Sequence, residues 1–163
     1  MDPAVVLRRA VDGDAGELLT VQRAAFVSEA QRYGDPSMPP LREDLDAVLA
    51  AIGEQVVLVA LRGTRLVGAV RGRVEGSTAH VGRLAVAPDQ QRQGLGSALL
   101  GALEEALPQG ITELRLFTGG DSAATIARYE RAGYVRAGES VDDHGTTLVH
   151  LVKEVGDPAR TIG

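Results

Sequence analysis

The stretch Leu84-Ala-Val-Ala-Pro-Asp-Gln-Gln-Arg-Gln-Gly-Leu-Gly-Ser97 decides how this chain of 163 residues folds. Its first residues end an apolar run typical of a buried strand, and Gly94 opens a stripe of apolar residues at helical spacing. The first N–H groups of a helix have no partner within the helix and lie at its positive dipole end, so they can bind an anion. Glycines at 94 and 96 let the backbone approach a phosphate closely. The stretch therefore predicts a strand, a loop and a helix that hold a phosphate or pyrophosphate.

Three phosphate-binding patterns compete for this segment. A P-loop requires GxxxxGK[ST], and no Gly-Lys pair is present. A dinucleotide-binding GxGxxG loop requires a third glycine where Leu99 stands, and the loop here is too long. The third pattern, Q/R-x-x-G-x-G/A, is met by Gln91-Arg92-Gln93-Gly94-Leu95-Gly96. A helix that merely follows a strand, without any ligand, is the remaining alternative.

A second pattern, Ala127-Arg-Tyr-Glu-Arg-Ala-Gly-Tyr134, follows further along the chain. Set in the order strand–helix–strand–helix, the two patterns resemble the GNAT family (Gcn5-related N-acetyltransferases). Residues 91–96 look like that family's pyrophosphate loop for acetyl-CoA, and 127–134 looks like its LYEKxGF signature. The resemblance covers roughly residues 5–153, and its context favours the phosphate-binding interpretation of the loop over the ligand-free helix.

The remaining patterns predict an α+β fold. Gly34, Pro36, Pro39 and Pro40 make 28–41 a loop or broken helix. The expected strands are 5–9, 56–61, 66–74, 78–86, 113–117, 134–137 and 146–153. The expected helices are 12–27, 45–52, 94–107 and 121–132. Aspartates at 12–14 are expected to cap the first helix, and Asp121 or Ser122 the last.

The resemblance makes this fold the GNAT fold. It implies a mixed, mostly antiparallel sheet of about seven strands with helices on both faces, like an α/β/α sandwich. It also implies that strands 78–86 and 113–117 splay apart. We expect residues 1–155 to form a single acetyltransferase domain and 156–163 a frayed C-terminal tail.

The cofactor implied by the resemblance is acetyl-CoA. The backbone of Leu84, Ala85 and Val86 would pair with its pantetheine arm in the gap between the splayed strands. Many members carry an asparagine that contacts this arm at the start of the following helix, where Asp121 and Ser122 stand here. The residues implied to hold the pyrophosphate are those of the loop and first turn: Gln91, Arg92, Gln93, Gly94, Leu95, Gly96 and Ser97.

The resemblance also implies catalytic roles. Tyr129 would be the general acid that protonates or hydrogen-bonds the coenzyme A sulfur as it leaves, the alternative being a core tyrosine. A backbone N–H in the strand, at Val86, would stabilise the oxyanion. The chain has no cysteine to carry an acyl group, which leaves direct attack by the amine in a ternary complex. His80 is a candidate general base, although a lone strand histidine is more often structural; Glu29, Glu75 and a water chain are other candidates.

By resemblance, the acceptor would lie against residues 29–44, where an acidic and aromatic set suits a cationic amine; an ordinary solvated loop is the equal alternative. The set is Glu29, Tyr33, Asp35, Met38, Glu43 and Asp44, of which Glu29 and Tyr33 are the substrate-binding candidates. Arg71 and Arg73 could meet an anionic group, but such alternating arginines more often form a solvated strand face. The expected partner is a small-molecule or peptide amine, with a homodimer possible.

Composition excludes several other classes of function. The absence of cysteine rules out disulfides and cysteine-ligated metals, and the three histidines lack metal-ligand spacing, so we expect no metal. A net charge of -5 and only 3% aromatic residues argue against nucleic-acid binding. No apolar run reaches the ~20 residues that cross a bilayer, so no membrane partner is expected.

These observations lead to one principal function and one alternative. An N-terminus without signal-peptide features predicts a cytoplasmic protein, and the arginine bias suggests a bacterial, GC-rich source. Acetyl-CoA-dependent N-acetyltransferase activity is the principal interpretation. A non-catalytic acyl-CoA binding or sensing module on the same fold is the alternative, and Tyr129 favours the enzyme.

Overall fold

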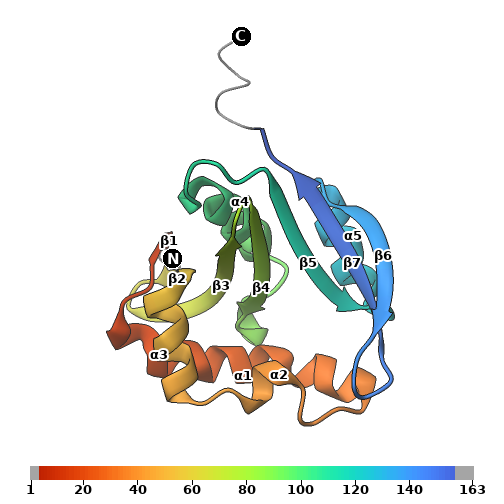
Figure 1. Cartoon of the computed structure of the whole chain (residues 1–163). Coiled ribbons are helices and arrows are strands. Elements are labelled where there is room, and N and C mark those ends of the chain that lie inside the picture. The colour runs from red at the N-terminus through yellow and green to blue at the C-terminus, as the bar shows by residue number, and fades with distance from the viewer. Residues whose placement is uncertain (1–3, 157–163) are drawn as a thin grey trace.

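The computed structural model describes residues 4–156, whose seven strands form one sheet in the order β1-β2-β3-β4-β5-β7-β6 (Figure 1). Neighbouring strands are antiparallel except β4 and β5, which run parallel. The mixed, mostly antiparallel sheet is therefore confirmed. The strands are β1 (Val5–Arg9), β2 (Val56–Arg62), β3 (Arg65–Glu75), β4 (Thr78–Val86), β5 (Glu113–Gly119), β6 (Val135–Val141) and β7 (Thr147–Glu154).

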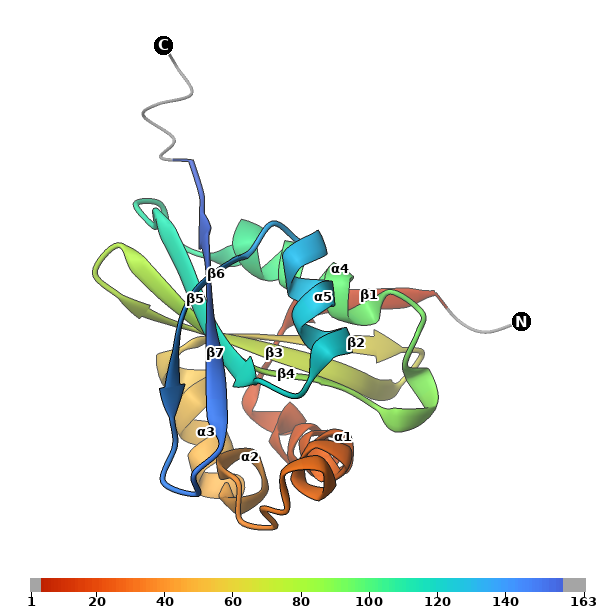
Figure 2. The same ribbon diagram turned by 90° about the vertical axis from the view of Figure 1, so that its right-hand side faces the viewer.

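Helices cover both faces of the sheet (Figure 2). Helices α1 and α3 pack on one face, and α4 and α5 on the other. The helical segments are η1 (Asp12–Asp14), α1 (Ala15–Tyr33), α2 (Pro39–Arg42), α3 (Leu45–Glu54), η2 (Pro88–Gln90), α4 (Leu95–Ala106) and α5 (Ala123–Arg131). The predicted tail lies outside the described residues, apart from Gly156.

The two-sided cover explains why β2 is apolar throughout. Val57 and Val59 belong to the hydrophobic cluster under α1 and α3, whereas Leu58 and Ala60 belong to the cluster under α4 and α5. Successive side chains of a strand point to opposite faces, so a strand buried on both sides needs an unbroken apolar run. The central strands therefore form a rigid platform beneath the site described below.

Helix α1 is longer than the sequence patterns predicted. It continues to Tyr33 and ends at Gly34, whose backbone is left-handed with φ 62°. The expected end at residue 27 is therefore wrong, and of the two alternatives for residues 28–41 the broken helix is confirmed, because α1 runs to Tyr33 and α2 begins at Pro39. Residues 28–33 contain Glu, Ala, Gln and Arg, which are good helix formers, and no glycine or proline interrupts them. The error matters because it places Glu29 and Tyr33 on a helix rather than on a loop.

Two of the expected helix caps are also wrong. The Asp14 carboxylate accepts hydrogen bonds from the Val11 N–H and from Arg8, not from the first turn of α1. Ser122 precedes α5, but neither it nor Asp121 caps the helix through its side chain. Asp44 does cap α3, because it accepts the Ala47 N–H at 2.9 Å, and so serves the fold rather than a ligand.

The parallel pair β4–β5 is joined over a short stretch only. Thr78, Ala79 and His80 pair with Glu113, Leu114 and Arg115, and beyond His80 the two strands are no longer paired. Figure 1 shows them diverging from that end of the sheet. The splayed pair implied by the sequence is therefore confirmed, and each strand leaves a free edge in the gap.

Candidate active site

A cavity of about 1160 Å³ lies where β4 and β5 separate. It is lined by both strands, the C-terminal half of α1, α2, the start of α4, one side of α5 and the β6–β7 loop. It brings together most of the residues singled out from the sequence: Glu29, Tyr33, His80, Leu84, Val86, Gln91, Arg92, Gly94, Leu95, Gly96, Ser97 and Tyr129. Ala85, Gln93, Asp121 and Ser122 do not belong to the lining.

The start of α4 forms an open cradle of backbone N–H groups. The first helical bond runs from the Ala98 N–H to the Gly94 carbonyl at 3.0 Å, so the N–H groups of Leu95, Gly96 and Ser97 have no partner within the helix. Gly94 is left-handed with φ 79°, and no atom lies within 4 Å of the position its Cβ would take. The left-handed turn at Gly94 and the unpartnered N–H groups that follow it together fit an anion bound by the backbone.

Two arginines supply positive charge to this cradle. Arg92 lines the cavity from the loop before α4 and is itself left-handed, with φ 65°. Arg128 reaches across from α5, and its Nη1 lies 3.4 Å from the position of a Cβ at Gly96. Sequence analysis singled out Arg92 but missed Arg128, whose only signal was its place next to Tyr129. The side chain of Gln93 turns away instead, and its Oε1 accepts a hydrogen bond from Arg62 at 2.8 Å.

The edge of β4 offers backbone groups to the gap. The Ala87 N–H donates to the Val67 carbonyl on β3 at 2.8 Å. Because neighbouring residues of a strand point their backbone groups to opposite sides, Val86 directs its N–H and carbonyl away from β3 and into the gap. The Val86 carbonyl accepts a 3.4 Å hydrogen bond from Gln91 Nε2. A ligand arm in the gap can therefore pair with β4 as an added strand would.

Tyr129 presents its hydroxyl group to the same cavity. The residue is 8% exposed, and its ring packs edge-on against Tyr134 at a centroid distance of 5.7 Å. Burial raises the pKa of Tyr129 to about 12, with Arg128 opposing and Glu29 reinforcing the rise. Within residues 4–156 no fully buried side-chain polar atom lacks a hydrogen-bond partner, and no protein group bonds this hydroxyl. The hydroxyl therefore opens to the cavity and can donate to a ligand.

His80 lies where β4 and β5 begin to separate. Its Nε2 is 3.6 Å from the Glu75 carboxylate, and its side chain is 36% exposed. Its neighbours in sequence, Ala79 and Val81, point into the core under α4, so His80 points to the opposite face. His80 lines the cavity, and its role as general base stays a prediction.

Glu29, Tyr33 and Ser122 form a hydrogen-bonded cluster at the end of α1. The Ser122 hydroxyl donates to Glu29 Oε2 at 2.8 Å and lies 2.6 Å from the Tyr33 hydroxyl. The Tyr33 oxygen also accepts the Asp121 N–H at 3.0 Å. Ser122 is only 2% exposed and fully engaged. In this structure the hydroxyl of Ser122 thus orients Glu29 and Tyr33, which both line the cavity.

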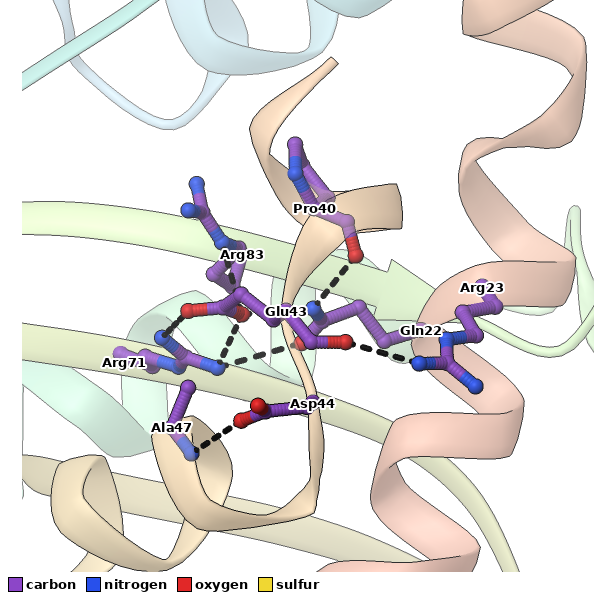
Figure 3. Close-up of polar contacts among 8 residues, drawn as sticks. All are labelled: Gln22, Arg23, Pro40, Glu43, Asp44, Ala47, Arg71 and Arg83. Carbon is purple, nitrogen blue, oxygen red and sulfur yellow. Dashed lines mark hydrogen bonds and ion pairs between the residues drawn. The ribbon is translucent and has the colours of Figure 1, made fainter. Parts of the chain in front are cut away.

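A second cluster, centred on Glu43, borders the cavity through Pro40, Arg71 and Arg83, whereas Glu43 itself is not part of the lining (Figure 3). Arg71 donates hydrogen bonds to both carboxylate oxygens of Glu43, at 2.8 and 2.9 Å. Gln22 Nε2 and Arg83 Nε also donate to the Glu43 carboxylate. Burial alone would raise the pKa of Glu43, but these donors outweigh it and lower the pKa to about 2. Arg71 is 7% exposed, so the expectation of a solvated arginine face is wrong there, whereas Arg73 is exposed and pairs with Glu75.

Comparison with known families identifies the architecture. Residues 35–155 match the sequence model described as "Acetyltransferase (GNAT) domain", which is most of the chain. The protein belongs to the GNAT family. The match includes β4, the cradle of α4, β5 and Tyr129, and the cofactor of GNAT acetyltransferases is acetyl-CoA.

Curated GNAT relatives act on different acceptors. S-(2-succino)cysteine N-acetyltransferase of Bacillus subtilis is 30% identical over 158 residues, which cover 91% of this chain and 94% of that protein. Mycothiol acetyltransferase of Clavibacter michiganensis is 41% identical over 125 residues, which cover 74% of this chain and 39% of that protein. The first match spans nearly the full length of both proteins, whereas the second spans less than half of its relative.

Solved GNAT structures share the fold at low sequence identity. YncA of Salmonella typhimurium, a putative acetyltransferase solved with acetyl-CoA, superposes with a TM-score of 0.76 at 21% identity and covers 96% of both chains. The PaiA N-acetyltransferase of Thermoplasma acidophilum, solved with coenzyme A, gives 0.72 at 18% identity and covers 93% of this chain and 99% of that one. Within residues 4–156 no helix is long and apolar enough to cross a membrane, and no cluster of side chains could hold a metal ion.

Proposed function

We propose that this GNAT protein transfers the acetyl group of acetyl-CoA to a primary amine, by direct attack in a ternary complex. The observation that carries the proposal is that one cavity contains both the open N-terminus of α4 and the free hydroxyl of Tyr129. The first is an anion site and the second a proton donor. The acceptor is a small molecule or a peptide, and the named acceptors of the two curated relatives favour a small molecule.

Binding uses the backbone more than side chains. Acetyl-CoA supplies a thioester whose acyl carbon can be attacked by an amine. The N–H groups of Leu95 to Ser97, with Arg92 and Arg128 beside them, hold the pyrophosphate. The free edge of β4 from Leu84 to Val86 aligns the pantetheine arm, and the Val86 N–H stabilises negative charge on the thioester oxygen. Asp121 and Ser122 act indirectly, through the cluster with Tyr33.

Tyr129 assists the departure of sulfur. Its raised pKa keeps the hydroxyl protonated throughout the range in which enzymes work. A thiol has an ordinary pKa near 8.5, so a thiolate is a weaker base than the Tyr129 phenolate. The favoured role is therefore a hydrogen bond that strengthens as charge grows on sulfur, while the departing thiolate takes its proton from water rather than from Tyr129.

Deprotonation of the acceptor falls to other titratable groups of the same cavity. A primary amine with a pKa up to ~10.4 arrives protonated and must lose a proton before attack. His80 and Glu29 both line the cavity there, and Glu75 lies behind His80. We assign the base to His80, with Glu29 acting as the carboxylate that attracts the ammonium ion.

Ligand binding is tested first by thermal unfolding with acetyl-CoA, and with ATP and NAD as controls. A ligand at 100 times its Kd adds ~2.7 kcal/mol of stability, which raises Tm by several degrees in a domain of this size. A rise with acetyl-CoA alone supports the site, and no rise at millimolar acetyl-CoA contradicts it. An amine panel with detection of free thiol then separates enzyme from sensor, because a sensor binds acetyl-CoA yet acetylates nothing.

A further inference from the structure

The Glu43 cluster contains one more positive charge than its carboxylate can balance. Arg71 uses both terminal nitrogens on Glu43, and its Nη2 also donates to Gln22 at 3.2 Å. This bidentate pair neutralises the Glu43 charge. Arg83 adds a second guanidinium, attached to Glu43 through Nε alone at 3.2 Å. The cluster as a whole is therefore positive, and the excess charge belongs to Arg83.

The terminal nitrogens of Arg83 are available to a ligand. Within residues 4–156 neither has a hydrogen-bond partner, and the side chain is 27% exposed. Figure 3 shows them directed away from Glu43, on the far side of the guanidinium from the Nε bond. Arg83 lines the cavity. Because Nε is anchored, the two free nitrogens form a fork that is already fixed in direction, which matches the two oxygens of a carboxylate.

The backbone also holds Arg83 in an unusual conformation. Its φ of 52° is left-handed, and the pairing of β3 with β4 shifts register between Gly82 and Ala85. A non-glycine residue in this region is strained, and such strain clusters at ligand-binding positions. The bulge re-aims the side chain out of the regular strand alternation and towards the Glu43 cluster.

We propose that Arg83 binds a carboxylate of the acceptor, so that the substrates of this enzyme are amino acids or related amines that carry a carboxylate. The proposal rests on the function proposed above. Arg92 and Arg128 serve the cradle at α4, whereas Arg83 lines the cavity from β4 and is bonded to Glu43, which lies in the segment that the resemblance assigns to the acceptor. The carboxylate binds Arg83 while the ammonium end of the same molecule faces Glu29 and His80.

The test compares amines that differ only in this carboxylate. The panel contains S-(2-succino)cysteine and common L-amino acids, each beside the matching carboxamide, with thiol release as the readout. We expect the carboxylates to have kcat/KM values higher by about ten- to a hundredfold, as for a hydrogen-bonded charged group. Conversion of the carboxylate to an amide lowers the pKa of the neighbouring amine, so more of the amine is unprotonated and ready to attack. This effect alone would make the amides react faster, so it opposes the expected preference for the carboxylates. Equal rates for acids and amides would overturn the proposal and leave acetyl transfer standing.

Variants locate the preference at Arg83. Arg83→Gln should raise KM for the carboxylates about ten- to a hundredfold, with the amides and the Kd of acetyl-CoA unchanged. Arg83→Lys keeps the positive charge but loses the pair of parallel N–H donors, so its KM for the carboxylates should lie between those of wild type and Arg83→Gln. Arg115→Gln is the control, because Arg115 is also bonded to a glutamate through Nε but is more exposed, at 49% against 27%, and does not line the cavity. A weaker acetyl-CoA affinity in Arg83→Gln would assign the residue to the cofactor and overturn the proposal.

A binding measurement keeps this proposal separate from the proposed function. The protein saturated with coenzyme A is titrated calorimetrically with N-acetyl-L-amino acids and with their amides. Binding of the acids that Arg83→Gln abolishes supports the carboxylate site even if no amine is acetylated, in which case the enzyme proposal alone fails. The proposed carboxylate site at Arg83 is overturned if none of the N-acetyl-L-amino acids binds and the amine panel shows no preference for carboxylates over amides.

Discussion

At the scale of single residues, Tyr129 combines a buried ring with an accessible hydroxyl. Loss of that hydroxyl in Tyr129→Phe should lower kcat by ~10²-fold or more and leave the Kd of acetyl-CoA unchanged, because the ring still packs against Tyr134. Steady-state kinetics and a separate binding titration check the two halves of this prediction. A variant that keeps wild-type kcat would remove Tyr129 from the mechanism.

Glu43 gives the protein a specific sensitivity to acid. Its pKa in the folded state is about 2, below the ordinary value of 4.5, so its contribution to stability is complete above pH 4.5 and is lost as the pH falls towards 2. The free energy of unfolding of wild type should therefore exceed that of Glu43→Gln most above pH 5. The two urea-unfolding curves should converge between pH 4.5 and 2. Parallel curves would show that Glu43 titrates normally.

At the scale of elements, the N-terminus of α4 depends on Gly94. In Gly94→Ala the left-handed backbone costs about 1 kcal/mol of stability, and relief of that strain shifts the N–H groups of the cradle that follow it. We expect acetyl-CoA affinity to fall at least about tenfold, beyond what this loss of stability explains. Gly101→Ala is the control, because Gly101 lies within α4 with open space at its Cβ position. It should leave affinity unchanged and raise stability by ~0.4–1 kcal/mol.

Helix α1 and strand β5 meet through Tyr33. A Cβ at Gly119 would overlap the Tyr33 ring, so a side chain there would force Tyr33 to move. Gly119→Ala should displace Tyr33, release its bonds to Ser122 and Asp121, and so free the Glu29 end of the acceptor site. We expect a higher KM for the amine with little change in acetyl-CoA affinity. Unchanged KM would mean that this cluster does not shape the acceptor site.

At the scale of the whole molecule, local patterns were enough for most of the fold. The period of apolar residues predicted the buried strands and the main helices, since both signals arise within one element. The long end of α1 was missed because weak loop signals after Gly34 outweighed helix propensity before it. Strand β6 extends to Val141, beyond the expected end at 137, because it is an exposed edge strand without apolar alternation.

The site was only partly predictable, for a physical reason. Residues in a continuous motif, such as the loop before α4, can be found from their spacing alone. The Glu43 cluster joins α1, the segment before α3, β3 and β4, and its bonds depend on how these elements pack. Arg71 therefore looked like a solvated strand residue, and Arg83 gave no signal, because its direction follows from a bulge that no pattern in the sequence marks.

Because β4 and β5 are paired only at one end, the sheet consists of two parts, β1 to β4 and β5 to β6, joined over three residue pairs. Neighbouring amides at the edge of β4 should then report ligand binding very differently in hydrogen–deuterium exchange. The Ala87 amide is bonded to Val67 and should be protected with or without ligand, whereas the Val86 amide faces the gap and should exchange quickly until acetyl-CoA is added. If both amides are protected without ligand, the two parts of the sheet are already paired at this point. If only the Val86 amide becomes protected when acetyl-CoA is added, the cofactor fills the gap and connects the two parts of the sheet.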